Sequence, residues 1–457
     1  MQVFVRLFIG NAGKASARLA ITALLAAALL PGQPDTGFRN GNAADPGPRA
    51  GPSGAGGPVP GLVGNEANTF QSGLQAFKNV NSVTGSLTGE GGLGPRFNLD
   101  SCAGCHSEPE IGGTSPAVNP QIEVGSKAGA LNTIPSFITS SGPIREARFI
   151  RGPNGSPDGG VAALFTIRGR TDAAGCNITQ PDFASAVANR NVSFRIPTPV
   201  FGAGLIEAID DTTILANMSS NSFQKSRRGI SGRVNQSGND GTITRFGWKA
   251  QNKSLFVFAA EAYNVEQGVT TDLFMHERDS PATCRFNITP EDHMDVSAAN
   301  LAEGFGDVVA FTMFMRLLAP PERGPTNASV NNGATLFNST GCALCHTPSL
   351  QTTITYGTAA LSNKPVNLYS DLILHNMGSG LADGISQGAA GPNDFRTAPL
   401  WGLGKRLFFL HDGRTSDLVD AIKAHSSNGS EANNVIDDFN SLSTSQKKDL
   451  LAFLRSL

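Results

Sequence analysis

The pattern Cys-x-x-Cys-His occurs twice in this chain of 457 residues, as Cys102-Ala103-Gly104-Cys105-His106 and as Cys342-Ala343-Leu344-Cys345-His346. It is the attachment signature of c-type haem. Two thiols at this spacing on a helical turn can form thioethers with the two vinyl groups of one porphyrin, and the histidine that follows can bind the iron. A single copy could instead be a redox or zinc pair beside an unrelated histidine. Two copies predict two covalently attached haem c groups.

Covalent haem attachment takes place outside the bacterial cytoplasm, so an export signal is expected at the N-terminus. A basic leader with Arg6, Lys14 and Arg18 precedes an almost unbroken apolar run over residues 19–30. This run is too short to span a bilayer comfortably and is typical of a signal peptide. Residues 1–31 are therefore predicted to be a signal for export to the periplasm, with an uncleaved membrane anchor as the alternative. No later segment is long and apolar enough to cross a membrane, so the mature form is expected to have no transmembrane span.

The rest of the composition is ordinary for an exported protein. A net charge of -2 gives no electrostatic reason to expect nucleic acid as a partner. The 53 glycines and 27 prolines imply long loops between the elements. Cys176 and Cys284 remain once the haem cysteines are assigned. In an oxidising compartment they can pair, and two buried free thiols are the alternative, because the sequence does not show their distance.

Composition and hydrophobic periodicity divide the chain into segments. Residues 32–64 are rich in Gly, Pro, Ala and Asp without apolar periodicity, which predicts a disordered linker. Helical spacing of Phe70, Leu74 and Phe77 marks the start of the folded part near residue 65. An apolar helical stretch over residues 308–318 ends at two prolines. We therefore expect an N-terminal haem domain over residues 65–325 and a C-terminal cytochrome c domain over residues 326–457.

The fold class expected is mainly α, with two cytochrome-c-like haem domains. Residues 330–337 read as a helix that leads into the second haem motif, and residues 443–457 read as another, capped by Ser443 or Thr444. Between residues 121 and 210, short β-branched runs alternate with Gly and Pro turns. The N-terminal domain is therefore expected to be enlarged by loops and short β-strands.

The second axial ligand of each iron decides its function, because an iron with an open side can bind peroxide or oxygen. For the C-terminal haem we expect His425, on a helix beginning near Ser416, because Leu418, Ile422 and His425 share one helical face. A surface histidine at a helix end is the alternative. The competitors for this ligand position are His375, Met377 and His411.

No ligand of this kind is evident for the N-terminal haem. His276 and His293 lie in polar, charged contexts and are expected at the surface, which predicts a five-coordinate iron. Its open face needs a proton-transfer group. Glu261 and Glu266 are the candidates, because the apolar residues 255–260 lead into them and partial desolvation would raise their pKa. A solvated glutamate at a helix end is the alternative.

Three parts of the sequence carry a family pattern. The first part begins with Phe-Gly-Trp-Lys-Ala at residues 246–250, continues with Ser254-Leu255 and ends with Asn-Val-Glu-Gln-Gly at residues 264–268. These three runs are similar to the family runs Phe-Trp-Asp-Gly-Arg-Ala, Ser-Leu and Pro-Val-Glu-Met-Gly. Residues 395–400 and 409–413 are similar to Phe-Lys-Thr-Pro-Thr-Leu and Tyr-x-His-Asp-Gly. From about residue 65 the chain thus resembles the di-haem cytochrome c peroxidase superfamily, and within it the di-haem oxidoreductase branch once labelled thiol oxidoreductase. The third part is position 425, where the peroxidases of this superfamily have Met, the related tryptophan-oxidising maturation enzymes have Tyr, and this chain has His.

The resemblance implies an electron-storing C-terminal haem, here with His346 and His425 as ligands, and a reactive N-terminal haem at His106. It places Trp248 between the haems as an electron relay and Glu266 on the distal side as the proton-transfer group. The implied function is a periplasmic di-haem oxidoreductase of the peroxidase type. A small donor protein, of cytochrome c or cupredoxin type, would supply electrons with which the N-terminal haem reduces peroxide or activates oxygen.

One departure from the family pattern bears on the substrate. The peroxidases carry a Gln shortly after Ser-Leu, where the nearest residue here is Phe258, and the spacing to Glu266 is shorter. An apolar distal pocket would better suit oxygen or a small organic substrate, as in the related di-haem rubber oxygenases. The alternatives to a peroxidase are thus a haem oxygenase acting on an organic substrate and a plain electron-transfer cytochrome with both irons six-coordinate.

Overall fold

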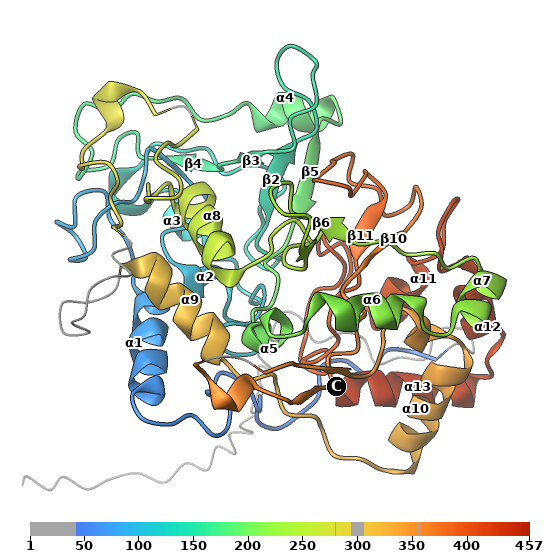
Figure 1. Cartoon of the computed structure of the whole chain (residues 1–457). Coiled ribbons are helices and arrows are strands. Elements are labelled where there is room, and N and C mark those ends of the chain that lie inside the picture. Colours follow the sequence, from blue (N-terminus) through green and yellow to red (C-terminus); the bar gives the residue numbers. More distant parts are fainter. Residues whose placement is uncertain (1–42, 279, 294–305, 355–356) are drawn as a thin grey trace, which may run out of the picture. The chain divides into compact units, whose positions relative to one another are not determined.

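The computed structural model describes residues 43–278, 280–293, 306–354 and 357–457 (Figure 1). The predicted signal peptide, residues 1–31, lies outside the described residues. Helices carry most of the regular structure, as expected, and each sheet has two or three strands. Within the described ranges, no helix is long and apolar enough to cross a membrane.

The first haem motif lies beside a pair of packed helices, α1 (Glu66–Lys78) and α9 (Asp307–Leu317). Both were predicted from their apolar periodicity. Phe77 of α1 packs on Phe314 of α9 with ring centroids 4.8 Å apart. At Gly73, a Cβ atom would lie 2.5 Å from the carbonyl oxygen of Ala310, so only glycine allows this close crossing.

The second haem motif lies beside an equivalent pair, α10 (Ala328–Ser339) and α13 (Thr444–Ser456). Ser443 caps α13 as predicted, accepting a hydrogen bond from the backbone N–H of Gln446 at 3.3 Å. Phe337 packs on Phe453 with centroids 5.3 Å apart, and a Cβ atom at Gly333 would lie 2.0 Å from the carbonyl oxygen of Asp449. Each motif therefore belongs to a helix pair with a glycine at the crossing, although no longer sequence repeat was evident.

A small antiparallel sheet of order β3-β2-β5 contributes one wall of the N-terminal site. Its strands are β2 (Glu146–Phe149), β3 (Val161–Ala162) and β5 (Val192–Arg195), within the region where short strands were expected. In the register of β2 and β5, Glu146 lies opposite Arg195. Figure 1 shows this sheet close to α8 (Leu255–Gln267), the helix that carries Glu266.

The remaining elements are short. The helices are α2 (Cys102–Cys105), α3 (Gln121–Val124), α4 (Phe183–Ala188), α5 (Ala203–Glu207), α6 (Asp211–Ser219), α7 (Ser222–Arg228), α11 (Leu418–Lys423) and α12 (Asn433–Ser441). The strands are β1 (Arg96–Phe97), β4 (Phe165–Thr166), β6 (Asn235–Gln236), β7 (Ile243–Thr244), β8 (Leu350–Gln351), β9 (Pro365–Val366), β10 (Leu374–Asn376) and β11 (Asp394–Arg396).

Residues 43–64, the described part of the expected linker, are fixed to the folded core. The carboxylate of Asp45 forms a buried ion pair with Arg455 of α13 and accepts a hydrogen bond from the backbone N–H of Leu418 at 2.8 Å. The backbone N–H of Val59 donates to the carbonyl oxygen of Leu317 at 2.7 Å. The expectation of disorder is wrong for this stretch, because hydrogen bonds and one ion pair hold a segment that has few apolar residues.

The expected boundary near residue 325 does not coincide with a gap between hydrophobic cores. The core around α1, α8 and α9 also includes Leu350, Leu368 and Trp401 from the C-terminal part. The division into two haem domains therefore remains a prediction. A second core, next to the first haem motif, contains a disulfide between Cys176 and Cys284, which decides the alternative that the sequence had left open.

Candidate functional site

The N-terminal motif forms a single helical turn. The hydroxyl of Ser101 caps α2 by accepting a hydrogen bond from the backbone N–H of Gly104 at 3.2 Å. The Nδ1 atom of His106 lies 3.0 Å from the carbonyl oxygen of Gly113. Burial lowers the pKa of His106 to about 4. The ring is therefore neutral, with Nδ1–H donating to Gly113 and the Nε2 lone pair free to bind a metal.

The C-terminal motif repeats this arrangement. Residues 342–344 form a short 3₁₀ turn, and the Nδ1 atom of His346 lies 2.9 Å from the carbonyl oxygen of Tyr369. Burial lowers the pKa of His346 to about 4. Phe337 of α10 lies 6.4 Å from the ring of His346, as Phe77 of α1 lies 6.0 Å from the ring of His106. The two histidines are thus held in the same way by equivalent helices.

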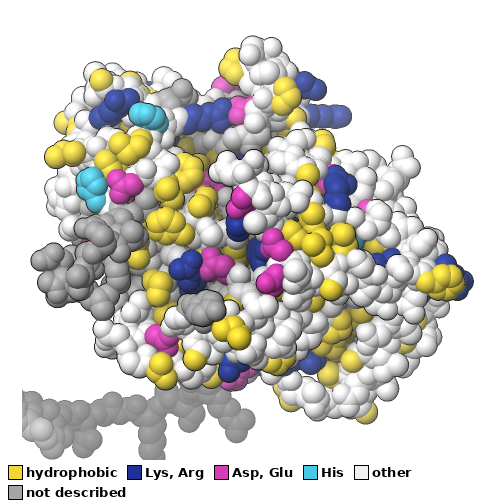
Figure 2. All heavy atoms as spheres, in the orientation of Figure 1, with side chains coloured by type: hydrophobic (Ala, Val, Ile, Leu, Met, Phe, Trp, Pro, Cys, Tyr) yellow, Lys and Arg dark blue, Asp and Glu magenta, His cyan; other side chains and the backbone are white. Residues whose placement is uncertain are grey.

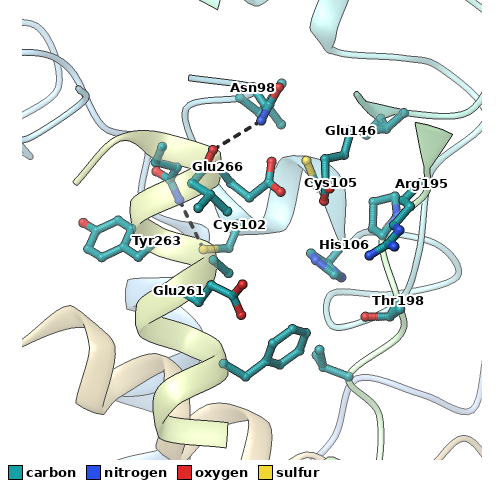
Figure 3. A pocket seen from close by; sticks show the side chains of 18 of the residues that line it. Asn98, Cys102, Cys105, His106, Glu146, Arg195, Thr198, Glu261, Tyr263 and Glu266 are labelled. Carbon is teal, nitrogen blue, oxygen red and sulfur yellow. Dashed lines mark hydrogen bonds between the residues drawn. The ribbon is translucent and has the colours of Figure 1, made fainter. Parts of the chain in front are cut away.

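The N-terminal motif opens on a cavity of about 1160 Å³, which we call the N-terminal cavity. Figure 3 shows Cys105 and His106 facing Glu261 and Glu266 of α8 across it, whereas Cys102 lies beside α8 and accepts a hydrogen bond from the side-chain amide of Gln267 at 3.3 Å. Among the described residues that line it, His106 is the one histidine. His293 has a side chain that is 69% exposed, and His276 is also exposed, as predicted. The thioether of Met315 lines the cavity too, and it is a candidate ligand that the sequence did not single out.

The carboxyl groups of this cavity differ in their surroundings. Burial, and then the nearby carboxyl group of Glu146 of β2, raise the pKa of Glu266 well above its usual range. Glu261 instead accepts a hydrogen bond from the side-chain amide of Asn252. Glu266 is therefore the carboxyl group best suited to hold a proton at neutral pH.

Basic side chains from the sheet and from the loop before it complete the N-terminal cavity. Arg145, Arg148 and Arg195 line it, and Arg148 pairs with Glu146. Arg195 is 3% exposed and pairs with Asp383 at 2.9 Å, yet its Nε atom has no hydrogen-bond partner. Buried polar atoms are rarely left unpaired. This donor is available to an anionic group, such as a haem propionate, in the cavity.

The second motif opens on a larger and mostly apolar C-terminal cavity of about 1390 Å³. His425 lines it together with His346, as predicted, and its Nδ1 atom lies 2.8 Å from the carbonyl oxygen of Ala421. The helix is shorter than expected: α11 is capped by Asp417, not Ser416, and ends at Lys423. Leu418, Ile422 and His425 nevertheless line the same cavity. The binding of iron by His425 stays a prediction that this placement supports.

His375, one competitor for that position, is held by two carboxylates. It lies 2.9 Å from Asp371 and 2.7 Å from Glu431. Burial opposes the charged form, but Cys345 and Asp371 outweigh it and raise the pKa of His375 well above its usual range. The ligand atoms of Cys345, Asp371 and His375 lie within 4.8 Å of one another. Since Cys345 belongs to the haem motif and both ring nitrogens of His375 face carboxylates, this cluster is a poor metal site.

Two buried arginines test whether the C-terminal cavity fits a haem. Arg396 and Arg406 both line it, and burial lowers the pKa of each to about 10. The positive charge of Arg406 further lowers the pKa of Arg396, whereas Asp371 partly offsets this. Two neighbouring buried cations are costly unless an anion joins them. The two propionates of a haem attached at Cys342 and Cys345 would be such anions, so the residues present fit the group.

Trp248 lies between the two cavities and lines both. Its indole N–H donates to the carbonyl oxygen of Ile196 at 3.0 Å. The ring meets His411 edge-on at 6.4 Å, and His411 stacks on Phe395 at 4.4 Å. His411 and Phe395 also line the C-terminal cavity. The aromatic contacts thus run from the N-terminal cavity into the C-terminal one.

The structure brings together most of the residues that the sequence singled out. His106, Glu261, Glu266 and Trp248 share the N-terminal cavity, and Trp248 also lies on the C-terminal one with His346 and His425. Sequence reasoning missed Glu146 and the arginines. Glu146 and Arg148 stand two residues apart in a β-branched region, a charged pair in a strand, and that signal could have drawn attention to them.

Comparisons with known proteins identify the family of the chain. Residues 155–457 match the family model described as "Di-haem oxidoreductase, putative peroxidase". No curated protein matches the chain. Among solved structures, the chain is similar to a MauG-like protein associated with microbial copper homeostasis, at 17% identity over 57% of this chain and 90% of that chain, with a TM-score of 0.30.

Two further solved structures resemble the chain. The diheme peroxidase BthA from Burkholderia thailandensis is 14% identical, over 68% of this chain and 92% of that chain, with a TM-score of 0.29. Hydrazine synthase from Kuenenia stuttgartiensis is 16% identical, over 33% of this chain and 55% of that chain, with a TM-score of 0.22. The chain thus spans about half the length of hydrazine synthase. The family match covers well over half of the chain, and the protein therefore belongs to the di-haem oxidoreductase family of peroxidases.

Proposed function

We propose that this protein is a periplasmic di-haem peroxidase, with an electron-accepting C-terminal site and a substrate-reducing N-terminal site. The observation that carries the proposal is the asymmetry of the two cavities. The C-terminal cavity offers a second imidazole, His425, together with His346, whereas the described lining of the N-terminal cavity offers no second imidazole, only carboxyl groups and the thioether of Met315. A haem iron with two protein ligands favours electron transfer, and one with a single protein ligand has a position open for peroxide or oxygen.

Glu266 is the proposed proton donor to a bound peroxide. Its carboxyl group lies on the face of α8 that lines the N-terminal cavity, and burial and Glu146 raise its pKa well above its usual range, which favours the protonated form. Peroxide reduction to water consumes protons, so a neutral carboxylic acid next to the substrate has a direct use. Arg195 and Arg148 supply positive charge that orients anionic groups in the same space.

Trp248 is the proposed relay between the two sites. It contributes to the walls of both cavities and is 8% exposed, so an electron moving between them meets an aromatic ring shielded from water. His411 and Phe395 extend this path on the C-terminal side. The electrons would come from a small cytochrome c or cupredoxin. Basic and acidic side chains are interspersed on the face shown in Figure 2, so docking there would not rely on a field of one sign.

The disulfide supports a location outside the cytoplasm. Disulfides such as Cys176–Cys284 persist in oxidising compartments. The basic and apolar leader of the sequence supports export to the periplasm. Covalent attachment of haem at both Cys-x-x-Cys-His motifs belongs to the same proposal.

Electron paramagnetic resonance of the ferric protein tests the asymmetry. We expect a high-spin signal from the N-terminal haem and a low-spin signal from the C-terminal one. Low-spin signals alone would refute the peroxidase and favour a plain electron-transfer cytochrome. His425→Ala should convert the C-terminal signal to high spin, whereas the matched variant His293→Ala should change neither signal.

A second candidate function follows from Phe258. This residue lines the N-terminal cavity where the peroxidases have a Gln, and its ring stacks on Phe246 at 6.1 Å. An apolar wall suits oxygen activation on a small organic substrate. Steady-state turnover distinguishes the two: a peroxidase consumes peroxide with a reduced donor, whereas an oxygenase consumes oxygen only when an organic substrate is present.

A further inference from the structure

The sheet beside the N-terminal cavity presents a second carboxyl group to Glu266. In β2, Glu146 and Arg148 are two residues apart and therefore point to the same side of the strand. Arg195 lies directly opposite Glu146 in the register with β5. All three side chains line the N-terminal cavity. The strand pattern and register thus place one carboxylate between two guanidinium groups on the wall that faces α8.

Glu146 and Glu266 meet at this wall. Figure 3 shows the side chain of Glu266 coming from α8 and that of Glu146 from β2, with Cys105 of the haem motif close to both. The carboxyl ends of the two side chains face each other there, and the proximity of Glu146 is one of the causes that raise the pKa of Glu266. Two carboxylates that face each other in a buried site repel when both are ionised, so the pair favours a proton held between them.

The surrounding charges decide which of the two holds the proton. Arg148 forms an ion pair with Glu146 and donates a second hydrogen bond to the carbonyl oxygen of Gly159 at 2.8 Å, which fixes the guanidinium. The charge of Arg148 and a hydrogen bond from Asn98 also lower the pKa of Glu266, but burial and Glu146 outweigh them. The other charged groups that line the cavity are Glu261, Arg145 and Arg195. The ion pair between Arg148 and Glu146 therefore favours Glu266 as the place of the proton.

We propose that Glu146 is a positioning residue for the proton donor, which accepts the hydrogen bond of Glu266 and holds that acid protonated beside the substrate. The inference rests on the proposed peroxidase function and deepens it, because it makes the donor a carboxyl pair and not a single glutamate. In the proton-transfer step, the O–H bond of Glu266 breaks and an O–H bond to the leaving oxygen of the peroxide forms, while the O–O bond breaks; the two electrons that this reduction needs come from the small donor protein, and the second proton comes from solvent. Glu266 is then a carboxylate next to Glu146, and their repulsion favours prompt reprotonation from solvent.

Infrared difference spectroscopy tests the pair without relying on turnover. A protonated carboxyl group gives a C=O stretching band, and the band that is present at neutral pH in the parent protein but absent in Glu266→Gln is assigned to Glu266. In Glu146→Gln, we expect this band to be lost at pH 7 and to return only at a pH lower by at least about one unit, since Arg148 is then free to pair with Glu266. An unchanged band in Glu146→Gln would overturn the proposal.

Two further variants control this measurement. Glu277→Gln removes another buried acid, whose pKa burial and the charge of Glu291 raise to about 9, and should leave the Glu266 band in place. Glu146→Asp keeps the negative charge but shortens the side chain, so the band should stay at pH 7 and move to the frequency of a weaker hydrogen bond. This variant keeps the test open if Glu146→Gln does not fold.

The turnover rate gives an independent check. We expect peroxide reduction by Glu146→Gln to fall by about 10–100-fold at pH 7 and to recover partly at acid pH, where Glu266 regains its proton. A loss of rate that is equal at every pH would indicate a merely structural role and overturn the proposal. If ferric spectra show a six-coordinate N-terminal haem, the peroxidase function fails, while the infrared band still decides whether the pair exists.

Discussion

Replacement of Asp45 by alanine should strongly destabilise the folded protein. Its carboxylate pairs with the guanidinium of Arg455, and both side chains are only 5–6% exposed. It also accepts the backbone N–H of Leu418 at the start of α11. Leaving one partner of a buried pair unpaired costs about 3–5 kcal/mol. The cost of losing the hydrogen bond at the start of α11 does not add fully to the cost of the unpaired Arg455, because both come from the same carboxylate. We therefore expect the free energy of unfolding to fall by about 4 kcal/mol.

Chemical denaturation monitored by circular dichroism measures this effect. Asp438→Ala is the matched control, because its ion pair with Arg228 is half-exposed and should contribute no more than about 1 kcal/mol. In Asp45→Ala combined with Arg455→Met, part of the loss should be recovered, since no buried charge is left unpaired. A loss in Asp45→Ala no greater than that in the control would show that residues 43–64 are not held to α11 and α13, and would refute the reasoning.

Three further outcomes are expected. Burial lowers the pKa of His411 to about 4, so on acidification the unfolded chain binds this proton at a higher pH than the folded protein does. The contribution of neutral His411 to the free energy of unfolding should be complete above pH 6.5 and should fall by up to about 3 kcal/mol as the pH drops towards 4. In denaturation measured as a function of pH, His411→Gln should reduce this loss. Gly333→Ala should destabilise by about 2 kcal/mol in the same assay, because overpacking against α13 outweighs the gain in helix propensity, whereas Asn331→Ala on the exposed face of α10 should not destabilise. Cys176→Ala with Cys284→Ala should lower the free energy of unfolding by about 3–5 kcal/mol, because the disulfide closes a loop across a sequence separation of 108, and an unchanged denaturation midpoint would contradict this.

Local sequence determined the elements that depend on neighbours in the chain. The spacing of Phe70, Leu74 and Phe77 predicted α1, and Ser443 or Thr444 as a cap predicted the start of α13, because helical periodicity and capping act within a few residues. The helical spacing of Leu418, Ile422 and His425 predicted that these side chains share one face, and all three line the C-terminal cavity even though α11 ends two residues before His425. The two Cys-x-x-Cys-His motifs likewise carry their chemistry within five residues.

Long-range contacts decided what the sequence left open or concealed. Nothing near His375 in the sequence shows that Glu431 lies 2.7 Å away, and nothing near Asp45 shows that Arg455 will pair with it. Both contacts convert ordinary polar residues into fixed, buried ones, because an ion pair removed from water needs its partner at a definite place.

The two haem motifs show the same division. The sequence by itself determined that each has a Cys pair and a histidine, and it indicated His425 for one of them. Only the tertiary structure showed that α1 with α9 and α10 with α13 cross in the same way, with Gly73 and Gly333 at the contacts. It alone also brought Glu146 to Glu266, since strand register and helix packing join residues that are far apart in the chain. The difference between the two sites is therefore a property of the fold, because the groups that face each motif come from distant segments.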